Sequence, residues 1–297
     1  MLLSSARRLA VCLAVATACV QAVSAADVLI NDAKSSPESL TVAPGGVLIV
    51  GSASTPFVYK VRAGATTAEK FIDATAEGPG TMFLGMLADA STNTLWTCQL
   101  TPVPGGTPGQ RKSALRSFTL DSGAPKLRWN LPGDSNVCND FVVGPDKALY
   151  ISDTGNAKIF KLPAGASAAD LFLEDRTALA GIDGITFLNG TLYVNNVRTN
   201  KVYRVPVDAA GQAAPAVEIV LDQPIKGPDG MRAANGKLLV AENGAGKISV
   251  ITVTGDKGTV TAIKEGLITP TAVEPAGDTI WIAERGTGKA VSIPMPK

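Results

Sequence analysis

The 297-residue chain contains no histidine. This absence excludes nucleophilic triads that need an imidazole base, histidine-ligated zinc centres and histidine proton relays. A metal site would depend on carboxylate, amide, carbonyl and water oxygens, which favours Ca²⁺, Mg²⁺ or Mn²⁺. Aromatic residues make up only 5% of the chain, against 30 glycines and 19 prolines. That composition is typical of many turns and short strands rather than long helices.

Long apolar runs are absent from the chain after its N-terminal segment. No later stretch reaches the roughly 18 apolar residues that a membrane-spanning helix needs. At the N-terminus, Arg7 and Arg8 precede an apolar run and a group of small residues that ends at Ala25, a pattern typical of secretory signals. We therefore expect residues 1–25 to be a signal peptide and the protein to be periplasmic or secreted. The alternative is a lipid anchor on Cys19, which lies in a loose lipobox.

A block of basic residues is also absent, and removing Arg7 and Arg8 changes the formal net charge from +1 to −1. This balance argues against nucleic acid or an anionic membrane as the main partner. Removal of the signal peptide leaves two cysteines, Cys98 and Cys138. An even pair in an exported protein favours a disulfide, and two buried thiols are the alternative.

A pattern of short apolar strands and Gly/Asn/Asp turns recurs six times along the rest of the chain. The repeats begin at Pro37, Leu84, Cys138, Ile182, Pro228 and Pro270. An outer strand follows each of the first five repeats, at residues 70–74, 126–129, 170–174, 216–221 and 259–264. The sixth repeat lacks such a strand, while residues 28–30 have strand character and no repeat of their own.

These observations predict an all-β fold in which residues 26–297 form one six-bladed β-propeller. The N-terminal strand is expected to join the last blade and close the ring, which removes an open sheet edge. The spacing of the repeats agrees with propeller blades. A solenoid or a pair of β domains is the alternative.

Aligned repeats place one residue of each blade at the mouth of the central channel. These residues are Glu38, Gly85, Asn139, Asp183, Asp229 and Thr271. Three carboxylates that converge without compensation repel each other, and a divalent cation with oxygen ligands would resolve this. Ordered water in a polar channel would do so as well. The alignment alone leaves both interpretations open.

The same positions carry a family resemblance. The segments Pro37-Glu38, Asn139-Asp140, Ile182-Asp183-Gly184 and Pro228-Asp229-Gly230-Met231 resemble motifs of the SMP-30/gluconolactonase/LRE-like superfamily, in the family's order. The resemblance covers nearly the whole mature chain. It implies a propeller with a divalent ion bound by Glu38, Asp183 and Asp229, with Asn139 next to substrate or water. Ca²⁺ is the first expectation, and Mg²⁺, Mn²⁺ or Zn²⁺ are alternatives.

Two departures from the lactonase pattern bear on specificity. Asp183 stands where lactonases commonly have asparagine, and Val137 stands where they often have an arginine that holds a sugar acid. The long connection at residues 101–112 could supply Arg111 as a substitute, or it could be a surface insertion. Sugar-lactone specificity is therefore open.

Two functions from different classes follow. In the first, the protein is a metal-dependent hydrolase of a lactone or related ester. Its metal activates the carbonyl and a water molecule, and Asp229 is the catalytic base. In the second, it is a non-catalytic propeller that binds a small molecule or a protein at the channel mouth.

Overall fold

Short strands build almost the whole molecule, because apolar residues alternate with polar ones over stretches of five to nine residues. Strand β16 (Lys201–Val205) mixes the two kinds of side chain without strict alternation, with Val202, Tyr203 and Val205 buried and the two basic side chains half-buried. The computed structural model describes residues 27–30, 33–107 and 110–296, so the expected signal peptide and Cys19 lie outside the described residues. Within those ranges the helices are three single-turn 3₁₀ segments: η1 (Ala33–Ser35), η2 (Pro44–Gly46) and η3 (Thr75–Glu77). None of the described helices is long and apolar enough to cross a membrane.

The strands form four four-stranded sheets and one eight-stranded sheet. Sheet 1 contains β2 (Pro37–Ala43), β3 (Val47–Ser52), β4 (Phe57–Val61) and β5 (Glu69–Asp73). Sheet 2 contains β6 (Met82–Asp89), β7 (Thr94–Pro102), β8 (Arg111–Thr119) and β9 (Pro125–Asn130). Sheet 3 contains β10 (Cys138–Val143), β11 (Leu149–Asp153), β12 (Lys158–Leu162) and β13 (Asp170–Glu174).

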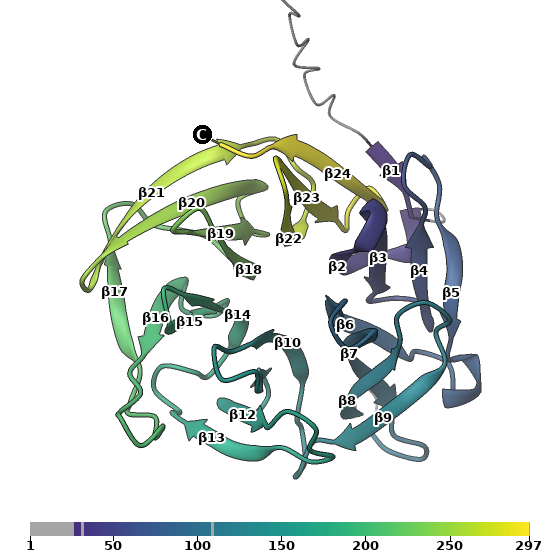
Figure 1. Cartoon of the computed structure of the whole chain (residues 1–297), viewed down its shortest axis with the longest axis horizontal. Helices are drawn as coiled ribbons and strands as arrows, with labels where there is room; N and C mark the ends of the chain where they lie inside the picture. The colour runs from purple at the N-terminus through teal and green to yellow at the C-terminus, as the bar shows by residue number, and fades with distance from the viewer. Residues whose placement is uncertain (1–26, 31–32, 108–109, 297) are drawn as a thin grey trace, which may run out of the picture.

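The remaining strands complete the ring. The double sheet contains β14 (Ile182–Leu188), β15 (Thr191–Asn196), β16, β17 (Val217–Leu221), β18 (Pro228–Ala234), β19 (Lys237–Glu242), β20 (Lys247–Thr254) and β21 (Lys257–Lys264). The closing sheet contains β22 (Pro270–Ala276), β23 (Thr279–Glu284), β24 (Lys289–Pro294) and β1 (Asp27–Leu29). Figure 1 shows the sheets around a common centre, with β2, β6, β10, β14, β18 and β22 innermost. The arrangement is propeller-like and all-β.

The double sheet differs from the sequence expectation, which separated its two halves as blades. Strands β17 and β21 pair in parallel through Val220↔Lys257 and Leu221↔Gly258. The cause is the β20–β21 hairpin, which has two strands of eight residues each and a tip that reaches over the neighbouring outer strand. At that tip Asp256 receives two hydrogen bonds from Arg204, at 2.5 and 3.2 Å. The contact covers an outer edge strand that would otherwise be open.

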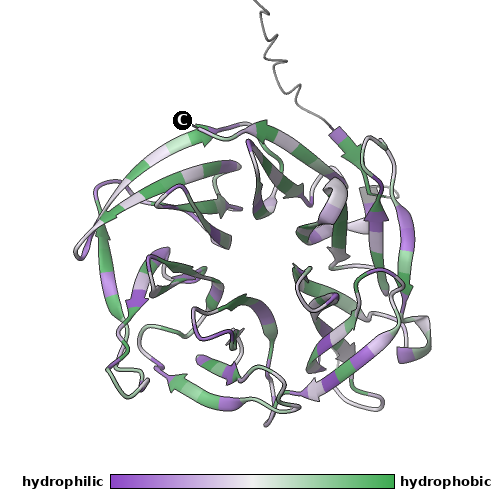
Figure 2. Ribbon diagram, viewed as in Figure 1, coloured by the Kyte–Doolittle hydropathy of each residue, from purple (hydrophilic) through white to green (hydrophobic). Residues whose placement is uncertain are grey.

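Strand β1 closes the ring, as the unpaired N-terminal segment predicted. It pairs antiparallel with β24, with Val28 opposite Ala290. Both side chains are buried in a cluster that also contains Val50 and Tyr59 of sheet 1. The first and last parts of the chain therefore share one core. Further clusters of this kind fill the spaces between neighbouring sheets, and Figure 2 shows hydrophobic residues along the strands around the whole ring.

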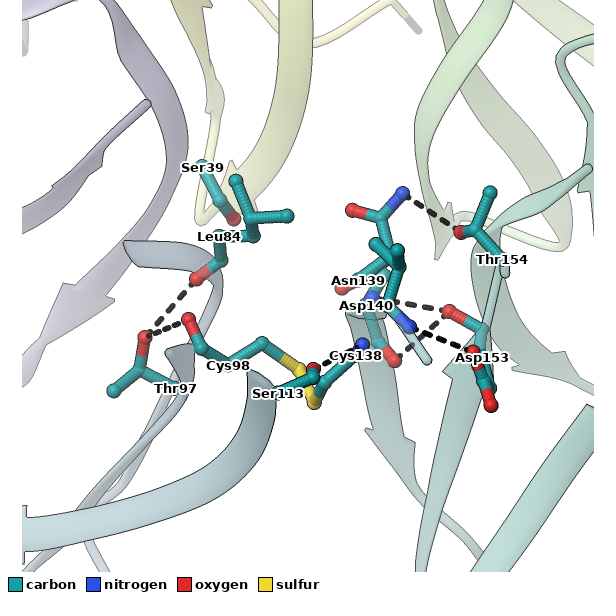
Figure 3. Close-up of a disulfide and its surroundings, with 12 residues drawn as sticks. Ser39, Leu84, Thr97, Cys98, Ser113, Cys138, Asn139, Asp140, Asp153 and Thr154 are labelled. Atoms are coloured by element: carbon teal, nitrogen blue, oxygen red, sulfur yellow. Dashed lines mark hydrogen bonds between the residues drawn. A yellow bond between two sulfur atoms is a disulfide. The ribbon is translucent and has the colours of Figure 1, made fainter. Parts of the chain in front are cut away.

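A disulfide between Cys98 on β7 and Cys138 at the start of β10 joins sheets 2 and 3 (Figure 3). The two Cα atoms are 5.3 Å apart, and both residues are fully buried. The backbone N–H of Cys138 also donates to Ser113 Oγ of β8, at 2.6 Å. These contacts fix the beginning of β10 directly before Asn139.

Replacing both cysteines by alanine is expected to lower stability by about 2–5 kcal/mol, because the cross-link spans 40 residues and restricts the unfolded chain. For a domain of this size that corresponds to a fall in Tm of roughly 5–15 °C, measurable by differential scanning calorimetry. The wild-type protein unfolded under reducing conditions is the control, and it should show the same fall. Equal Tm values for the oxidised, reduced and alanine forms would contradict the prediction.

Candidate functional site

A repeated β-bulge presents the candidate residues to the channel. Each innermost strand has one shift of register with its neighbour, as between Pro228↔Glu242 and Met231↔Val240. The shift follows the first residue of the strand except in β6, where it follows the third, Leu84. Asp229 lies inside that shift, and Asp183 lies inside the corresponding shift of β14. The same shift holds Glu38, Gly85, Asn139 and Thr271 in the other innermost strands. All six positions expected from the repeat line one small cavity.

The glycine that follows each aspartate allows the innermost strands to approach closely. A Cβ atom at Gly184 would lie 2.6 Å from the carbonyl oxygen of Asp229, and one at Gly230 would lie 2.8 Å from that of Thr271. Contacts this short do not occur with a real side chain. The Asp-Gly pairs therefore serve strand packing and acid placement together, since the approach brings Asp183 towards Asp229.

Asp183 and Asp229 form the electrostatic centre of the site. Asp183 is buried and Asp229 is half-buried. Loss of hydration raises the pKa of Asp229 to about 7, even though Asn243 donates a hydrogen bond to its Oδ2 at 3.1 Å. Burial, together with the charges of Asp229 and Asp140, raises the pKa of Asp183 well above its usual value. The two carboxyl groups therefore retain a proton under mildly acidic conditions.

Asn139 lies beside this pair. Its side-chain hydrogen bond to Asp183 favours the ionised carboxylate and lowers the pKa of that group, against the larger effect of burial. Its Nδ2 donates to Thr154 Oγ1 at 3.1 Å, which orients the amide (Figure 3). The cavity among these residues has a volume of about 10 Å³, which is space for one water molecule or small ion. A substrate would therefore have to lie over the mouth rather than inside the cavity.

Two arginines that the sequence interpretation did not identify neutralise the other channel acids. Arg232 donates to both oxygens of Asp140, at 2.7 and 3.1 Å, and to Glu274 at 3.2 Å. The charges of these acids raise the pKa of Arg232 above its usual value, despite burial, which acts in the opposite direction. Among the six described innermost strands Arg232 is the only basic residue, which was the signal in the sequence that could have revealed it.

Glu38 forms an ion pair with Arg285, which follows strand β23. Within residues 27–30, 33–107 and 110–296, no three His, Cys, Asp or Glu side chains are grouped so that they could hold a metal ion. The donor chemistry that remains is two carboxyl groups and the Asn139 amide, a set suited to a hard, oxygen-binding dication. Glu38 would add a third carboxylate only by leaving Arg285.

Arg111 does not line the cavity. Its guanidinium donates to the carbonyl oxygen of Gly80, two residues before β6, at 2.5 Å. Part of the long connection that precedes it lies outside the described residues. A role for Arg111 in substrate binding stays a prediction.

No protein-family model and no curated protein matches the chain. Solved structures do match it. A gluconolactonase from Xanthomonas campestris has 17% identity and a TM-score of 0.65, over 89% of each chain. A catalytically inactive histidine-to-alanine variant of virginiamycin B lyase from Staphylococcus aureus, solved with quinupristin, has 17% identity and a TM-score of 0.62, over 92% of this chain and 99% of that one. A chain of a nidogen–laminin complex has 14% identity and a TM-score of 0.63, over 84% and 89%.

These likenesses show the fold. They include a gluconolactonase and a virginiamycin B lyase, which agrees with the superfamily resemblance seen in the sequence motifs. At such low identity they do not transfer an activity.

Replacing Gly184 by alanine is expected to lower stability by about 1–3 kcal/mol, because the new methyl group would collide with the backbone of β18. This corresponds to a fall in Tm of roughly 3–10 °C. Thr191→Ala, at the half-buried start of β15, is the control and should change stability by less than about 0.5 kcal/mol. A Gly184→Ala protein as stable as the wild type would contradict the close approach.

The pKa of Asp229 predicts a specific dependence of stability on pH. The folded protein binds a proton up to about pH 7, whereas the unfolded aspartate, with a pKa of 3.8, releases it much earlier. The contribution of this group to stability is therefore complete below about pH 4 and is lost as pH rises through 7. Asp229→Asn removes that loss. In metal-free buffer its Tm at pH 8 should exceed the wild-type value by roughly 2–8 °C, and the difference should shrink steadily as the pH is lowered towards 4.

The matched control for this comparison is Asp278→Asn, at an exposed turn. Its Tm should follow the wild-type curve across the whole pH range. Parallel curves for Asp229→Asn and wild type would rule out an unfavourable buried charge at position 229.

Proposed function

We propose that this protein is an exported, divalent-metal-dependent hydrolase of a lactone or related ester, built on a six-bladed β-propeller. The observation that carries the proposal is the Asp183–Asp229 pair at the channel mouth, with Asn139 and Asn243 beside it. Two interacting, poorly hydrated carboxyl groups need a proton or a cation to offset their repulsion. A dication supplies that charge at neutral pH.

The blade count follows from the strand order. Strands β14 to β17 and strands β21 to β18 are each consecutive antiparallel meanders, and they are joined by a parallel contact of two residue pairs. We count these halves as separate blades, since each has its own innermost strand. Together with sheets 1 to 3 and the closing sheet they make six.

Asp183, Asp229 and the Asn139 amide oxygen would hold the ion, and Glu38 would complete the set after separating from Arg285. Ca²⁺ suits such oxygen ligands best, and Mg²⁺, Mn²⁺ or Zn²⁺ are alternatives. When bound, such an ion polarises a carbonyl group and lowers the pKa of water. Asp229 would accept the proton from the attacking water and return it to the leaving oxygen. Asn243 would keep the Asp229 carboxyl group oriented through its hydrogen bond.

The substrate would lie over the mouth, next to Asn139. Val137 occupies the position at which lactonases often have an arginine for a sugar acid, so we do not restrict the proposal to sugar lactones. We also do not extend it to lyase chemistry. Virginiamycin B lyase is inactivated by a histidine-to-alanine change, and this chain has no histidine to supply that side chain.

A non-catalytic binding propeller is the second candidate. It is favoured by the two ion pairs that already neutralise Glu38 and Asp140 without any metal. A mouth satisfied by its own arginines could hold a ligand or protein partner without turnover.

Export rests on the N-terminal pattern and receives support from the disulfide. Disulfides persist in oxidising compartments such as the periplasm and the extracellular space. We therefore propose that residues 1–25 are removed and that the mature domain resides there.

Metal analysis and calorimetry of the mature protein test the proposal. Wild-type protein should bind close to one divalent ion per chain with a rise in Tm of roughly 5 °C or more, and it should hydrolyse at least one member of a lactone and aryl-ester panel. Asp229→Asn should lose the rise in Tm and at least about 100-fold of the turnover, the scale of a general base. Asp183→Asn, the residue common in lactonases, should still bind the ion.

Two results would change the conclusion. Absence of any bound ion and of any Tm shift would reject metal dependence. A bound ion without turnover on the panel would favour the binding propeller instead.

A further inference from the structure

A second and much larger cavity lies at the opposite end of the ring from Asp183 and Asp229. Its volume is about 870 Å³, within the range of small-molecule sites. It opens between sheets 2 and 3, beside the turn after β6 and the turn after β12. Thr41 and Glu274 at the channel form its inner end.

The strand register explains how the cavity is built. On sheet 2, Leu87, Trp96, Ser117 and Leu127 stand opposite one another across all four strands. On sheet 3, Val143, Leu149 and Leu162 form the facing row. All seven residues line the cavity. It is therefore the space between two facing cross-strand rows.

The interface between sheet 3 and the double sheet is the next one around the ring, and comparison with it shows why this space stays open. Tyr150 on β11 stands opposite Val142 just as Trp96 stands opposite Leu87. Tyr150 is buried by edge-on contacts with Phe172 and Phe187, whose ring centroids are 4.9 and 5.0 Å away. Trp96 is half-buried instead. The turn that reaches over it contains only Pro163, Ala164, Gly165, Ala166 and Ser167, which are too small to fill the gap.

Two polar side chains of the cavity can donate hydrogen bonds to a bound molecule. Ser117 lines the cavity and carries a hydroxyl group that can donate. Lys147, in the exposed turn after β10, also lines the cavity, and its ammonium group forms no ion pair with a carboxylate among the described residues. The positive charge of Lys147 favours an anionic group on the ligand.

The carboxyl groups that line the cavity are already satisfied. Asp89 accepts from the hydroxyls of Ser91 and Thr92, at 2.6 and 2.5 Å. Glu274 accepts from Thr41 and Arg232, each at 3.2 Å. What remains for a ligand is the exposed part of an indole ring, an apolar wall and donors.

We propose that this cavity is a second binding site, for a small aromatic acid. The ring would lie against Trp96 and the apolar rows, the acid group would meet Lys147, and a ligand oxygen would accept from Ser117. The site shares none of the acids proposed to bind a metal, so it does not depend on the proposed hydrolase activity.

Isothermal titration calorimetry with 2-naphthoate, and with 2-naphthol as the uncharged comparison, tests this assignment. Wild-type protein should bind 2-naphthoate at one site with a Kd below about 100 μM, within reach of a ligand of this size. Trp96→Ala should weaken binding at least tenfold. Lys147→Ala should weaken binding of 2-naphthoate and leave that of 2-naphthol unchanged.

Ser117→Phe places a ring in the cavity beside Trp96 and Leu127, so it should weaken binding at least tenfold, and the Tm of the variant is measured to show that it is folded. Trp281→Phe, in the closing sheet, is the matched control for the loss of an indole and should bind like the wild type. Asp229→Asn should also bind like the wild type, which separates this site from the channel mouth.

No detectable binding of 2-naphthoate to the wild-type protein would overturn the proposal. Undiminished binding to Trp96→Ala or Ser117→Phe would overturn it as well, because the ligand would then lie elsewhere. Equal affinity for 2-naphthol and 2-naphthoate would overturn the assignment of an acid.

Discussion

The central constraint on this structure is that carboxyl groups from different sheets meet around a narrow, poorly hydrated channel. Each sheet sends the start of its innermost strand to the same place, and the Asp-Gly pairs allow the strands to approach within contact distance. Like charges brought together away from water repel strongly. Every other polar feature of the channel can be understood as a way of offsetting that repulsion.

The offset takes three forms, and the acids Glu38, Asp140, Asp183 and Asp229 that need it line one cavity. Arg232 neutralises Asp140 and Glu274 from β18, and Arg285 neutralises Glu38 at the rim. Asp183 and Asp229 have no arginine and rely on a retained proton and on two asparagines. A cation that enters the channel therefore has one favourable target, the pair that still lacks a countercharge. The local electrostatics thus favour the proposed metal site at this pair.

The sequence allowed most of the strands to be predicted, because strand position depends on short-range alternation and turn residues. The outer strand expected at 170–174 is β13, and the unpaired strand near Val28 closes the ring on β24. The parallel contact between β17 and β21 could not be predicted, since it depends on the length and path of the β20–β21 hairpin in space. The inward positions of Asp183, Asp229 and Asn139 followed from the repeat. The pairing of Glu38 with Arg285 did not, because it joins residues 247 positions apart.

The two ends of the ring differ in packing density, although both are built from the same repeated unit. At the mouth with Asp183, the bulges and glycines draw the strands together until there is room for little more than one water molecule. At the other end, the contact between neighbouring sheets depends on the size of side chains that lie farther from the channel. Phe172 and Phe187 cover Tyr150 between sheet 3 and the double sheet, while small turn residues leave Trp96 half-buried between sheets 2 and 3. The disulfide and the hydrophobic cluster around it already hold sheets 2 and 3 together. The part of the interface next to the large cavity therefore need not be filled for the ring to be stable. A propeller can thus carry a tight polar site and an open apolar one without either compromising the other.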